Sequence, residues 1–504
     1  MEHPLPNFYT AGLGQAAGSR AEDGKGTDGC MKRIKYCSSA IIIFMDHDPR
    51  LLAAHILSTW TEIHDPPRIE SREEPEWQAL EPRDRALAFD LICGVIRRRL
   101  TLDSMIHAVS KTPLNKIDPD VMAVLRMGAY QLIVAKGIAD HAAINTSVEL
   151  MRQLGADRAA SFVNAVLRSI QRLGGVVEPL CEPDVHAFPL DSRRQIKFRR
   201  PLFPDPQRQF IHHLAVTTSH PRELVSAIIQ WLGPEIARQI LIADNVPPMV
   251  IVRSDNPNFV PPAHTGLIPH QTAHFYVAAD GWNPAIEALI AHGTLSPQDP
   301  TSARPVQALI AAWKQYHPDT PARYIVDLCA GRGTKSIQLA RALDHTGIIA
   351  CDIAPDKLAA LNQRSAQIGV TNIRTMDISA LQHQKPEDID IVLVDAPCSN
   401  TGVMGRRLQL RWRWPLFNVQ AMRDLQTRLL RDAANILRPD GLLVYSTCSI
   451  DPGENVEMVQ QFMQSQRANS WQLIHQSSQL PAATDAPQRC DGGFTAVLRH
   501  TGES

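Results

Sequence analysis

The sequence predicts a multidomain protein in which an all-α bundle is followed by an α/β domain with a doubly wound parallel sheet. Three observations support this fold class. The 504 residues exceed what a single hydrophobic core usually organises, so two or three domains are expected. Apolar residues recur at helical spacing through residues 46–173. From Arg323 onward, short β-branched runs alternate with helical segments, which is typical of a parallel sheet.

The composition is that of an ordinary globular protein. Hydrophobic residues make up 44% of the chain and charged residues 20%, which argues against a disordered or fibrous protein. The formal net charge is −1, so any contact with nucleic acid must depend on local basic patches. The nine cysteines form no CxxC pair and no Cys/His run at zinc spacing. We therefore expect no disulfide framework and no metal, and we predict a cytoplasmic location.

Residues 1–45 are predicted to form a disordered extension. Their apolar stretch at residues 40–45 is far shorter than the roughly 20 residues that a membrane-spanning helix needs. The stretch also lies too deep in the chain for a typical signal peptide, so no membrane association is expected. Met45 is a candidate for the true initiator, a hypothesis that a native N-terminus at Met1 would contradict.

Residues 46–173 are predicted to form the helical bundle. Asp84 can cap the first helix of the series, Pro119 marks the start of another, and Gly155 closes a third before Asp157. Apolar residues at helical spacing include Leu87, Leu91 and Val95. This segment is therefore expected to pack as a domain of its own.

Two further segments are predicted between the bundle and the α/β domain. Residues 174–205 lose periodicity and gather glycines and prolines, which predicts a linker. The linker carries a basic run that is either an RNA contact or an ordinary solvated surface: Arg193, Arg194, Lys197, Arg199 and Arg200. Residues 206–300 are expected to form an α+β connecting subdomain that binds RNA, with helices at 221–231 and 234–244 and a strand at 249–253.

A loop with two glycines predicts a cofactor site in the α/β domain, which is assigned to residues 301–504. The loop follows a strand at 324–328 and consists of Cys329, Ala330, Gly331, Arg332, Gly333, Thr334 and Lys335. Glycines let a backbone turn sharply and approach a ligand closely. The loop does not match a dinucleotide fingerprint, because Ser336 stands where a third glycine is needed. It does not match a phosphate-binding P-loop either, because Thr334 precedes the lysine.

Acidic residues follow the next three predicted strands. Asp352 ends the strand at 348–351, Asp377 the strand at 373–376, and Asp395 the strand at 389–394. Asp352 lies about twenty residues beyond the glycines, where a carboxylate can accept hydrogen bonds from ribose hydroxyls. The carboxyl ends of parallel strands meet at one crevice, so these side chains are expected to surround one ligand. For Asp377, the alternative is a helix cap.

Two cysteines follow the fourth and fifth predicted strands. Cys398 lies in Asp395-Ala-Pro-Cys-Ser, and Cys448 lies in Tyr-Ser-Thr-Cys-Ser. One cysteine at a strand end would more often fill the core. Two thiols at neighbouring strand ends suit a pyrimidine substrate, because carbon 5 of cytosine becomes nucleophilic only after a thiolate adds to carbon 6. Asp395 can then bond the ring nitrogen and the amino group of the base.

The segment after Cys398 mixes arginine with tryptophan. Arg406, Arg411 and Trp412 are predicted to contact RNA, because guanidinium groups neutralise phosphates and aromatic faces stack on unpaired bases. The alternative is a solvated, charged helix face.

Residues 323–499 resemble the catalytic domain of the RNA 5-methylcytosine methyltransferases through the motifs D-A-P-C-S-x-x-G and Y-S-T-C-S. The resemblance implies that Cys448 is the nucleophile, that Cys398 promotes release, and that Asp395 and Pro397 belong to the base pocket. It also implies that S-adenosylmethionine is surrounded by residues 329–335 with Asp352, Lys357, Asp377 and Asp395. Gln298-Asp299 and Asp491-Gly-Gly-Phe494 resemble two further motifs of that domain. The chain departs from the usual loop C-A-A-P-G-G-K-T at Gly331, Arg332 and Thr334.

The helical bundle resembles the NusB-type RNA-binding fold. The similarity lies in the segments at 84–97, 125–132, 141–145 and 162–168. A NusB-like bundle ahead of a Rossmann-like methyltransferase domain resembles the bacterial ribosomal small-subunit RNA methyltransferase B family, also called Sun or Fmu. This resemblance implies formation of 5-methylcytosine in unassembled small-subunit (16S) ribosomal RNA, through a covalent cysteine adduct, by a monomeric enzyme. The alternatives are the same chemistry on transfer RNA and a non-catalytic NusB-like RNA-binding factor.

Overall fold

The computed structural model describes residues 48–63, 65–67, 75–135, 137–279, 281–381, 389–466, 470–482 and 486–502. The prediction of a disordered extension at 1–45, with Met45 as initiator, lies outside the described residues. The described residues belong to one compact unit, His47–Ser504.

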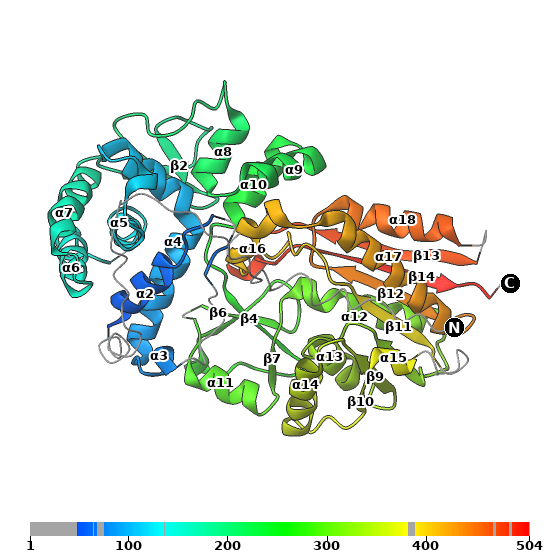
Figure 1. Ribbon diagram of the computed structural model, residues 1–504. Coiled ribbons are helices and arrows are strands. Elements are labelled where there is room, and N and C mark those ends of the chain that lie inside the picture. Colours follow the sequence, from blue (N-terminus) through cyan, green and yellow to red (C-terminus); the bar gives the residue numbers. More distant parts are fainter. Residues whose placement is uncertain are drawn as a thin grey trace, which may run out of the picture. The chain divides into compact units, whose positions relative to one another are not determined.

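The N-terminal part of this unit is a helical bundle (Figure 1). Its helices are α2 (Pro49–Ser58), α3 (Pro75–Gln78), α4 (Pro82–Val109), α5 (Pro119–Ile133), α6 (Asp140–Gln153) and α7 (Asp157–Gln171). Helix α5 begins at Pro119 as predicted, and Gly155 adopts φ +68° between α6 and α7. Asp84 does not cap α4, because the helix begins two residues earlier at Pro82 and Asp84 lies within the first turn.

Small residues allow the helices of the bundle to approach one another closely. A Cβ atom on Gly94 of α4 would lie 2.2 Å from the Tyr130 ring of α5, and one on Gly128 would lie 2.6 Å from Leu167 of α7. The Tyr130 hydroxyl donates to Asp90 Oδ1 at 3.0 Å. The glycines inside these helices, which weaken an isolated helix, are therefore explained by interhelical packing.

The predicted linker at 174–205 contains a small antiparallel sheet. Strands β1 (Val176–Pro179), β2 (Ala187–Pro189) and β3 (Arg194–Lys197) pair in the order β1-β3-β2. Phe188, Phe198 and Phe203 fill an apolar cluster with Met105 of α4. The segment is therefore a packed element, and its three- and four-residue strands are too short to show periodicity in the sequence.

The next segment contains helices and a four-stranded antiparallel sheet. The predicted helices at 221–231 and 234–244 are α9 (Arg222–Leu232) and α10 (Pro234–Ala243), and the predicted strand is β4 (Val250–Ser254). The other elements are α8 (Phe210–Thr218), β5 (Leu267–Pro269), β6 (Phe275–Ala278), α11 (Pro284–Ala291) and β7 (Leu295–Pro297), with sheet order β5-β6-β4-β7.

The C-terminal part is a doubly wound domain built on a seven-stranded sheet in the order β10-β9-β8-β11-β12-β14-β13. Its strands are β8 (Tyr324–Asp327), β9 (Gly347–Cys351), β10 (Ile373–Met376), β11 (Ile391–Asp395), β12 (Leu442–Thr447), β13 (Trp471–Gln479) and β14 (Gly493–His500). The first five in the order are parallel, and β14 is antiparallel to both of its neighbours. The α/β fold class predicted from the sequence is confirmed.

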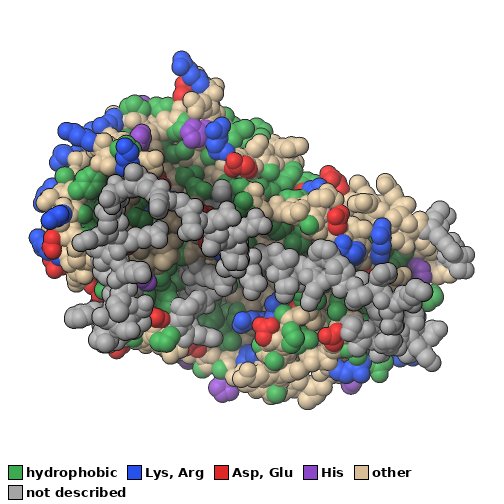
Figure 2. Space-filling view, in the orientation of Figure 1, with side chains coloured by type: hydrophobic (Ala, Val, Ile, Leu, Met, Phe, Trp, Pro, Cys, Tyr) green, Lys and Arg blue, Asp and Glu red, His purple; other side chains and the backbone are tan. Residues whose placement is uncertain are grey.

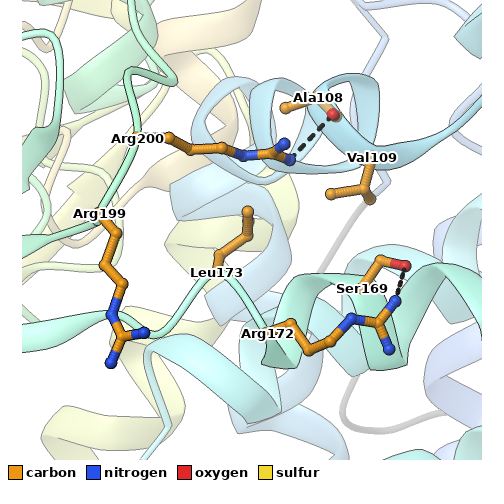
Figure 3. Close-up of a pocket in the computed structure, with 7 residues that line it drawn as sticks. All are labelled: Ala108, Val109, Ser169, Arg172, Leu173, Arg199 and Arg200. Carbon is orange, nitrogen blue, oxygen red and sulfur yellow. Dashed lines mark hydrogen bonds between the residues drawn. The ribbon is translucent and has the colours of Figure 1, made fainter.

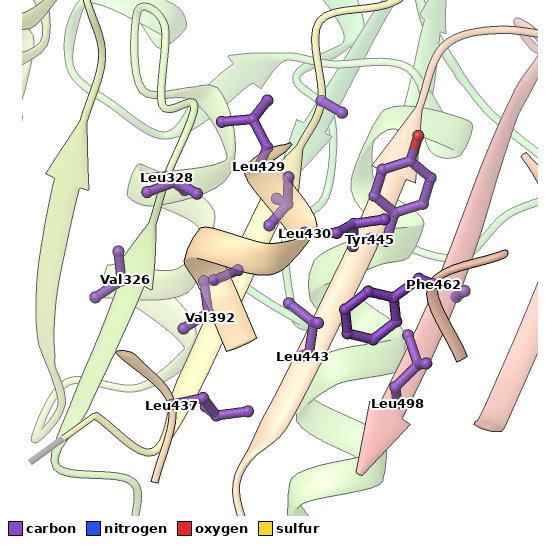
Figure 4. Packing of buried hydrophobic residues seen from close by; sticks show 14 of the residues in the cluster. Val326, Leu328, Val392, Leu429, Leu430, Leu437, Leu443, Tyr445, Phe462 and Leu498 are labelled. Atoms are coloured by element: carbon purple, nitrogen blue, oxygen red, sulfur yellow. The ribbon is translucent and has the colours of Figure 1, made fainter. Parts of the chain in front are cut away.

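Helices cover both faces of this sheet. Leu443 and Tyr445 of β12 pack with α17 (Val419–Ile436) and α18 (Val456–Ser465), as Figure 4 shows for one part of this core. Leu442 and Val444 point to the other face, against α12 (Pro300–Tyr316) and α13 (Thr334–Ala342). This alternation follows the two-residue period of a strand, and burial on both faces explains the continuous apolar runs in the sequence. Helices α14 (Pro355–Gln367), α15 (Ile378–Leu381) and α16 (Leu408–Arg413) complete the domain.

No helix in the described part of the chain is both long enough and apolar enough to cross a membrane. Within the same residues, no group of three or more His, Cys, Asp or Glu side chains is arranged to hold a metal ion.

Candidate active site

The site lies at the carboxyl edge of the parallel strands. Strand β11 pairs with β8 on one side and β12 on the other, so the loops that follow all three strands meet. Asp395 lies opposite Ser446 in the last pair of the β11–β12 ladder. The sequence predicted this convergence from strand ends alone, and the structure brings Cys398 and Cys448 into contact there.

The two sulfur atoms are direct neighbours. Cys398 Sγ lies 3.4 Å from Cys448 Sγ, and the Cys448 thiol is 3.1 Å from Asn400 Oδ1, which can accept its hydrogen bond. Cys398 is buried, whereas Cys448 is partly exposed. The hydrogen bond with Cys448, together with burial, raises the pKa of Cys398 well above its ordinary value. Cys398 is therefore a protonated thiol at neutral pH, and Cys448 is the sulfur that a ligand can reach.

Asn400, two residues after Cys398, has an unusual backbone conformation. Its φ of +57° lies in the left-handed region, which asparagine tolerates better than most residues. Its Nδ2 donates to the carbonyl of Cys398 at 2.7 Å while its Oδ1 faces Cys448. One side chain thus orients both cysteine segments. Sequence analysis missed this residue; the signal that could have found it is an asparagine inside the D-A-P-C-S-x-x-G motif.

A buried carboxyl group fixes the backbone after Cys398. Glu454 accepts hydrogen bonds from the Ser399 amide at 2.9 Å and from the Ser399 hydroxyl. Gln426 of α17 donates both to the carbonyl of Pro397 at 2.9 Å and to Glu454 at 3.1 Å. Burial raises the pKa of Glu454, while the hydrogen bonds from Ser399 oppose that shift. Sequence analysis did not select Glu454, although it follows Cys448 closely in the chain.

Asp395 is held by two donors. Lys335 Nζ lies 2.6 Å from Asp395 Oδ2, and the Ser446 hydroxyl donates to Oδ1 at 2.8 Å. Burial acts to lower the pKa of Lys335, but the adjacent Asp395 carboxylate outweighs burial and the pKa lies above its ordinary value. The lysine of the predicted cofactor loop therefore remains charged, and it joins that loop to the cysteine half of the site.

One glycine of the cofactor loop faces open space, and the other is in tight contact with α14. Gly331 (φ +56°) and Gly333 (φ +85°) both adopt left-handed conformations. A Cβ on Gly333 would lie 2.0 Å from Leu361 Cδ1 of α14, whereas one on Gly331 would meet nothing within 4 Å. The Gly331 amide donates to Asp352 Oδ2 at 2.9 Å, and Lys357 Nζ lies 3.6 Å from Asp352 Oδ1. The space over Gly331 and the carboxylate at its side fit a nucleoside ligand such as S-adenosylmethionine.

The remaining predicted cofactor residues differ in their burial. Cys329 is partly buried, and burial raises its pKa well above the ordinary value. Ala330 is buried, and its amide donates to the Cys351 carbonyl at 2.7 Å. Arg332 and Thr334 are exposed, and Thr334 begins α13. Asp377 is exposed directly before α15, so the helix-cap alternative stays open for it.

Asp327, which sequence analysis also missed, is buried at the end of β8. The Ser336 hydroxyl donates to Asp327 Oδ2 at 2.6 Å. Burial raises the pKa of Asp327 to about 7, against the opposing effect of the Ser336 hydrogen bond. The signal was available, because Asp327 stands at the end of the first predicted strand as Asp395 stands at the end of the fourth.

The structure contradicts the prediction that Arg411 and Trp412 contact RNA. Both side chains are completely buried in α16. Arg411 donates to Asn245 Oδ1 at 2.9 Å and to the Asp244 carbonyl at 2.8 Å, and Trp412 Nε1 donates to the Ile96 carbonyl of α4 at 3.2 Å. Buried groups of this kind hold elements together, so this part of the RNA prediction is corrected.

Arg406 is also tied to protein groups. It donates to Asp491 Oδ2 at 2.6 Å, to Asp299 Oδ2 at 3.2 Å and to the Met249 carbonyl at 2.8 Å. Its side chain is 30% exposed to solvent. The two acidic residues that sequence analysis selected from separate motifs, Asp299 and Asp491, therefore meet at one arginine, and RNA contact by Arg406 stays a prediction.

Comparisons with known proteins identify the families that the chain resembles. Residues 316–498 match the family model described as 16S rRNA methyltransferase RsmB/F, and residues 47–172 match the NusB family model. The "Putative methyltransferase Rv1407" of Mycobacterium tuberculosis is 30% identical over 385 residues, which are 75% of this chain and 78% of that protein. The ribosomal RNA small subunit methyltransferase B of Xanthomonas campestris is 29% identical over 435 residues, which are 83% and 89% of the two chains.

One solved structure is similar over most of the chain. The crystal structure of PH0851 superposes with a TM-score of 0.62 at 17% identity, covering 89% of this chain and 98% of that one. At this level of identity the match concerns the fold alone.

Proposed function

The chain belongs to the RsmB/F family of methyltransferases with an N-terminal NusB domain, and from this premise we propose that it methylates carbon 5 of a cytosine in 16S ribosomal RNA through a covalent cysteine adduct. Membership makes the chain an S-adenosylmethionine-dependent methyltransferase. The observation that carries the proposal is the pair of thiols 3.4 Å apart, next to the Asp395 carboxylate. We propose that the substrate is free RNA in the cytoplasm, before subunit assembly, and that the enzyme acts as a monomer.

S-adenosylmethionine supplies, when bound, an electrophilic methyl group. We assign its binding to the loop at 329–335 with Asp352, Lys357, Asp377 and Asp395. The open space at Gly331 leaves room for a ligand, and Asp352 offers carboxylate oxygens to ribose hydroxyls. Lys335 holds Asp395 between this loop and the cysteines. Of the three departures from the usual loop, Gly331 faces open space, and Arg332 and Thr334 are exposed.

Cys448 is assigned as the nucleophile because it is the accessible sulfur. The Cys448 sulfur forms a bond to carbon 6 as its thiol proton leaves. The electrons of the C5=C6 bond shift to give a C4=C5 double bond, and N3 takes up the released proton. Asn400 orients the sulfur, and Asp395 accepts hydrogen bonds from the ring nitrogen and the amino group. Pro397 forms part of the base pocket, with its carbonyl fixed by Gln426. Carbon 5 is then nucleophilic and takes the methyl group.

Cys398 is assigned to product release. A base must remove the proton from carbon 5, so that the electrons of that bond restore C5=C6 and expel Cys448 as a thiolate. In the free enzyme, the hydrogen bond with Cys448 is the largest cause of the high pKa of Cys398. In the adduct, Cys448 is an uncharged thioether, and this cause is removed. The pKa of Cys398 therefore falls at the step that needs a base.

Substitution and covalent trapping distinguish the roles of the two cysteines. Cys448→Ala should give no methylated cytosine and no protein–RNA adduct, whereas Cys398→Ala should accumulate an adduct that survives denaturing electrophoresis. Cys181, an exposed cysteine outside the site, gives the control Cys181→Ala, which should methylate at the normal rate. Methylation by Cys448→Ala, or absence of any adduct with Cys398→Ala, would contradict the assignments.

The substrate is identified by bisulfite sequencing of total RNA from strains with and without the gene. The proposal expects one cytosine in 16S ribosomal RNA to lose its protection when the gene is deleted. Loss of protection only in transfer RNA would keep the chemistry and replace the substrate.

A further inference from the structure

We propose that Arg172, Arg199 and Arg200 form a second RNA-binding site, which holds the phosphodiester backbone of the substrate outside the active site. The identity of the ligand rests on the proposed function, because the site itself selects only for phosphate. The three arginines surround a cavity of about 370 Å³ between the ends of α4 and α7 and the segment after β3. Figure 3 shows their side chains together with Leu173, which also lines the cavity.

The structure divides the basic run at 193–200 into paired and unpaired residues. Arg194 pairs with Asp191, and Lys197 lies 3.7 Å from both Glu178 and Asp184. Among the described residues, no carboxylate pairs with Arg172, Arg199 or Arg200. From the sequence, the basic run at 193–200 was either an RNA contact or a solvated surface. The structure separates its residues whose charge is balanced by a carboxylate from those whose charge is not.

The unpaired arginines retain most of their hydrogen-bonding capacity. Arg200 donates to the Ala108 carbonyl at 3.0 Å, and Arg172 donates to the Ser169 hydroxyl at 2.7 Å (Figure 3). Both acceptors are neutral, and a guanidinium has about five N–H donors in a fixed planar fork. Each contact therefore positions a guanidinium and leaves several donors for a phosphate.

The backbone that carries the three residues belongs to a helix end and to a packed segment. Arg172 caps the C-terminus of α7, and Arg199 follows Phe198, which is buried against Phe188 and Phe203. Cations near helix C-termini are favourable, and this alone would explain one arginine at the end of α7 and one near the end of α4. It does not explain Arg199, which contacts neither helix end through any hydrogen bond in the described structure, or the convergence of all three on one cavity.

The ligand that fits is a polyanion. The whole chain carries a formal net charge of −1, so three uncompensated cations in one cavity are a local exception. In the face shown in Figure 2, other Lys and Arg side chains gather on the same side as α6 and α7. Arginine forks bind phosphate through two hydrogen bonds at once. The cavity residues belong to none of the strand ends that form the active site, so the proposed site would bind a part of the RNA other than the target nucleotide.

The test measures RNA binding without catalysis. In full-length Cys448→Ala protein, binding of transcribed, unmodified 16S ribosomal RNA is followed by fluorescence anisotropy across a range of salt concentrations. The triple variant Arg172→Ala, Arg199→Ala, Arg200→Ala should bind at least tenfold more weakly. The slope of log affinity against log salt should become shallower by about 0.7–0.9 for each phosphate that the variant no longer neutralises.

Two controls separate the site from general effects of charge and folding. Arg158→Ala removes an exposed arginine from the first turn of the same helix α7, and should leave affinity and slope unchanged. Replacing the three cavity arginines by lysine keeps the charge and should restore most of the salt slope but only part of the affinity. Unchanged affinity and slope in the triple alanine variant, with a normal melting temperature, would overturn the proposal.

The result of this test can contradict the second site without contradicting the proposed function, and the reverse is also possible. If the wild-type enzyme methylates no cytosine but its RNA binding depends on the three arginines, the catalytic proposal falls and the second site stands. If methylation proceeds and the triple variant binds normally, the reverse holds.

Discussion

Residues at similar positions in the sequence pattern differ in their burial and in their hydrogen-bond donors. Asp327 and Asp395 each end a parallel strand, yet Asp327 is fully buried beside one hydroxyl donor, whereas Asp395 receives a lysine and a serine. Desolvation penalises the charged form of a carboxyl group, so burial raises the pKa of Asp327 to about 7. The difference in burial therefore brings the titration of Asp327 close to neutral pH.

This difference predicts how stability depends on pH. The folded pKa of Asp327 lies above its ordinary value of 3.8, so between these two pKa values the folded state binds more protons than the unfolded state. Stability from this group is present at low pH and is lost as the pH rises through about 7. Asp327→Asn removes the titration and keeps an acceptor for Ser336. The variant should gain melting temperature relative to wild type as the pH rises from about 5.5 to about 8.

Thermal unfolding of both proteins at the two pH values checks this prediction. A constant difference in melting temperature would show that Asp327 does not titrate in this range. Asp244, whose pKa burial also raises to about 7, serves as an internal comparison, because it is unchanged in the variant and acts equally on both proteins.

Side-chain pairing within the site was predictable only where a motif specified both partners. Cys398 and Cys448 stand at the ends of strands that the sequence pattern identifies as neighbours, so their convergence followed from strand order. Glu454 and Asn400 act through hydrogen bonds to the loop backbone. No periodicity reports such contacts, because they depend on loop conformations such as the positive φ of Asn400.

At the level of elements, the loop between β8 and α13 contains two glycines required for different reasons. Gly333 is needed by the fold, since a Cβ there would overlap Leu361 of α14. Gly331 has the same left-handed backbone but faces open space. The structure therefore separates a glycine that packing requires from a glycine that faces open space.

Matched alanine substitutions test this separation. Both variants carry a similar backbone penalty of about 1–2 kcal/mol for a left-handed alanine. Gly333→Ala adds a steric overlap and should lower the melting temperature more than Gly331→Ala does. Gly331→Ala should instead weaken S-adenosylmethionine binding at least tenfold, because its Cβ would occupy the open space that the proposed function assigns to the cofactor. Calorimetric titration and thermal unfolding of the two variants give both quantities, and equal affinity in Gly331→Ala and wild type would place the cofactor elsewhere.

Elements were predictable where they were long and amphipathic. Helices α9 and α10 and strand β4 lie within one residue of their predicted bounds. The sheet of β1, β2 and β3 was missed because prolines and glycines mask three short strands. Helix α16 was misinterpreted because arginine and tryptophan have the same pattern in an RNA contact and in a buried hydrogen-bonded cluster. The acceptors of Arg411 lie 166 and 167 residues earlier in the chain and leave no local signal.

In the whole molecule, helix α16 connects the catalytic domain to the helical bundle. The Trp412 indole packs edge to face on Trp60 at 5.3 Å, and the Arg97 guanidinium donates to the Gly405 carbonyl at 3.4 Å. The domain boundaries predicted from composition stay predictions. These contacts indicate that the parts on either side of them do not fold with full independence.

Removal of the indole should therefore destabilise the whole chain. Trp412→Ala creates a cavity beside Trp60 and leaves the hydrogen bond to Ile96 unmade, at a cost of about 3–5 kcal/mol. The neighbouring Arg413, which is only partly buried, gives the control Arg413→Ala, expected to change stability by less than about 0.5 kcal/mol. Denaturant midpoints of the two variants measure the difference. Equal midpoints would mean that the contact between α16 and α4 contributes nothing to stability.

Trp412 and Ile96 are separated by 316 positions, and this separation becomes a time interval during synthesis. A ribosome adds about 5–20 residues per second, so the indole emerges roughly 15–60 s after the helix that receives it. Until then, the nascent chain lacks the indole that packs on Trp60 and donates to the Ile96 carbonyl. The part of the chain made first thus completes its packing only when the part made last has been delivered, and we expect a translational pause between the two to prolong that interval.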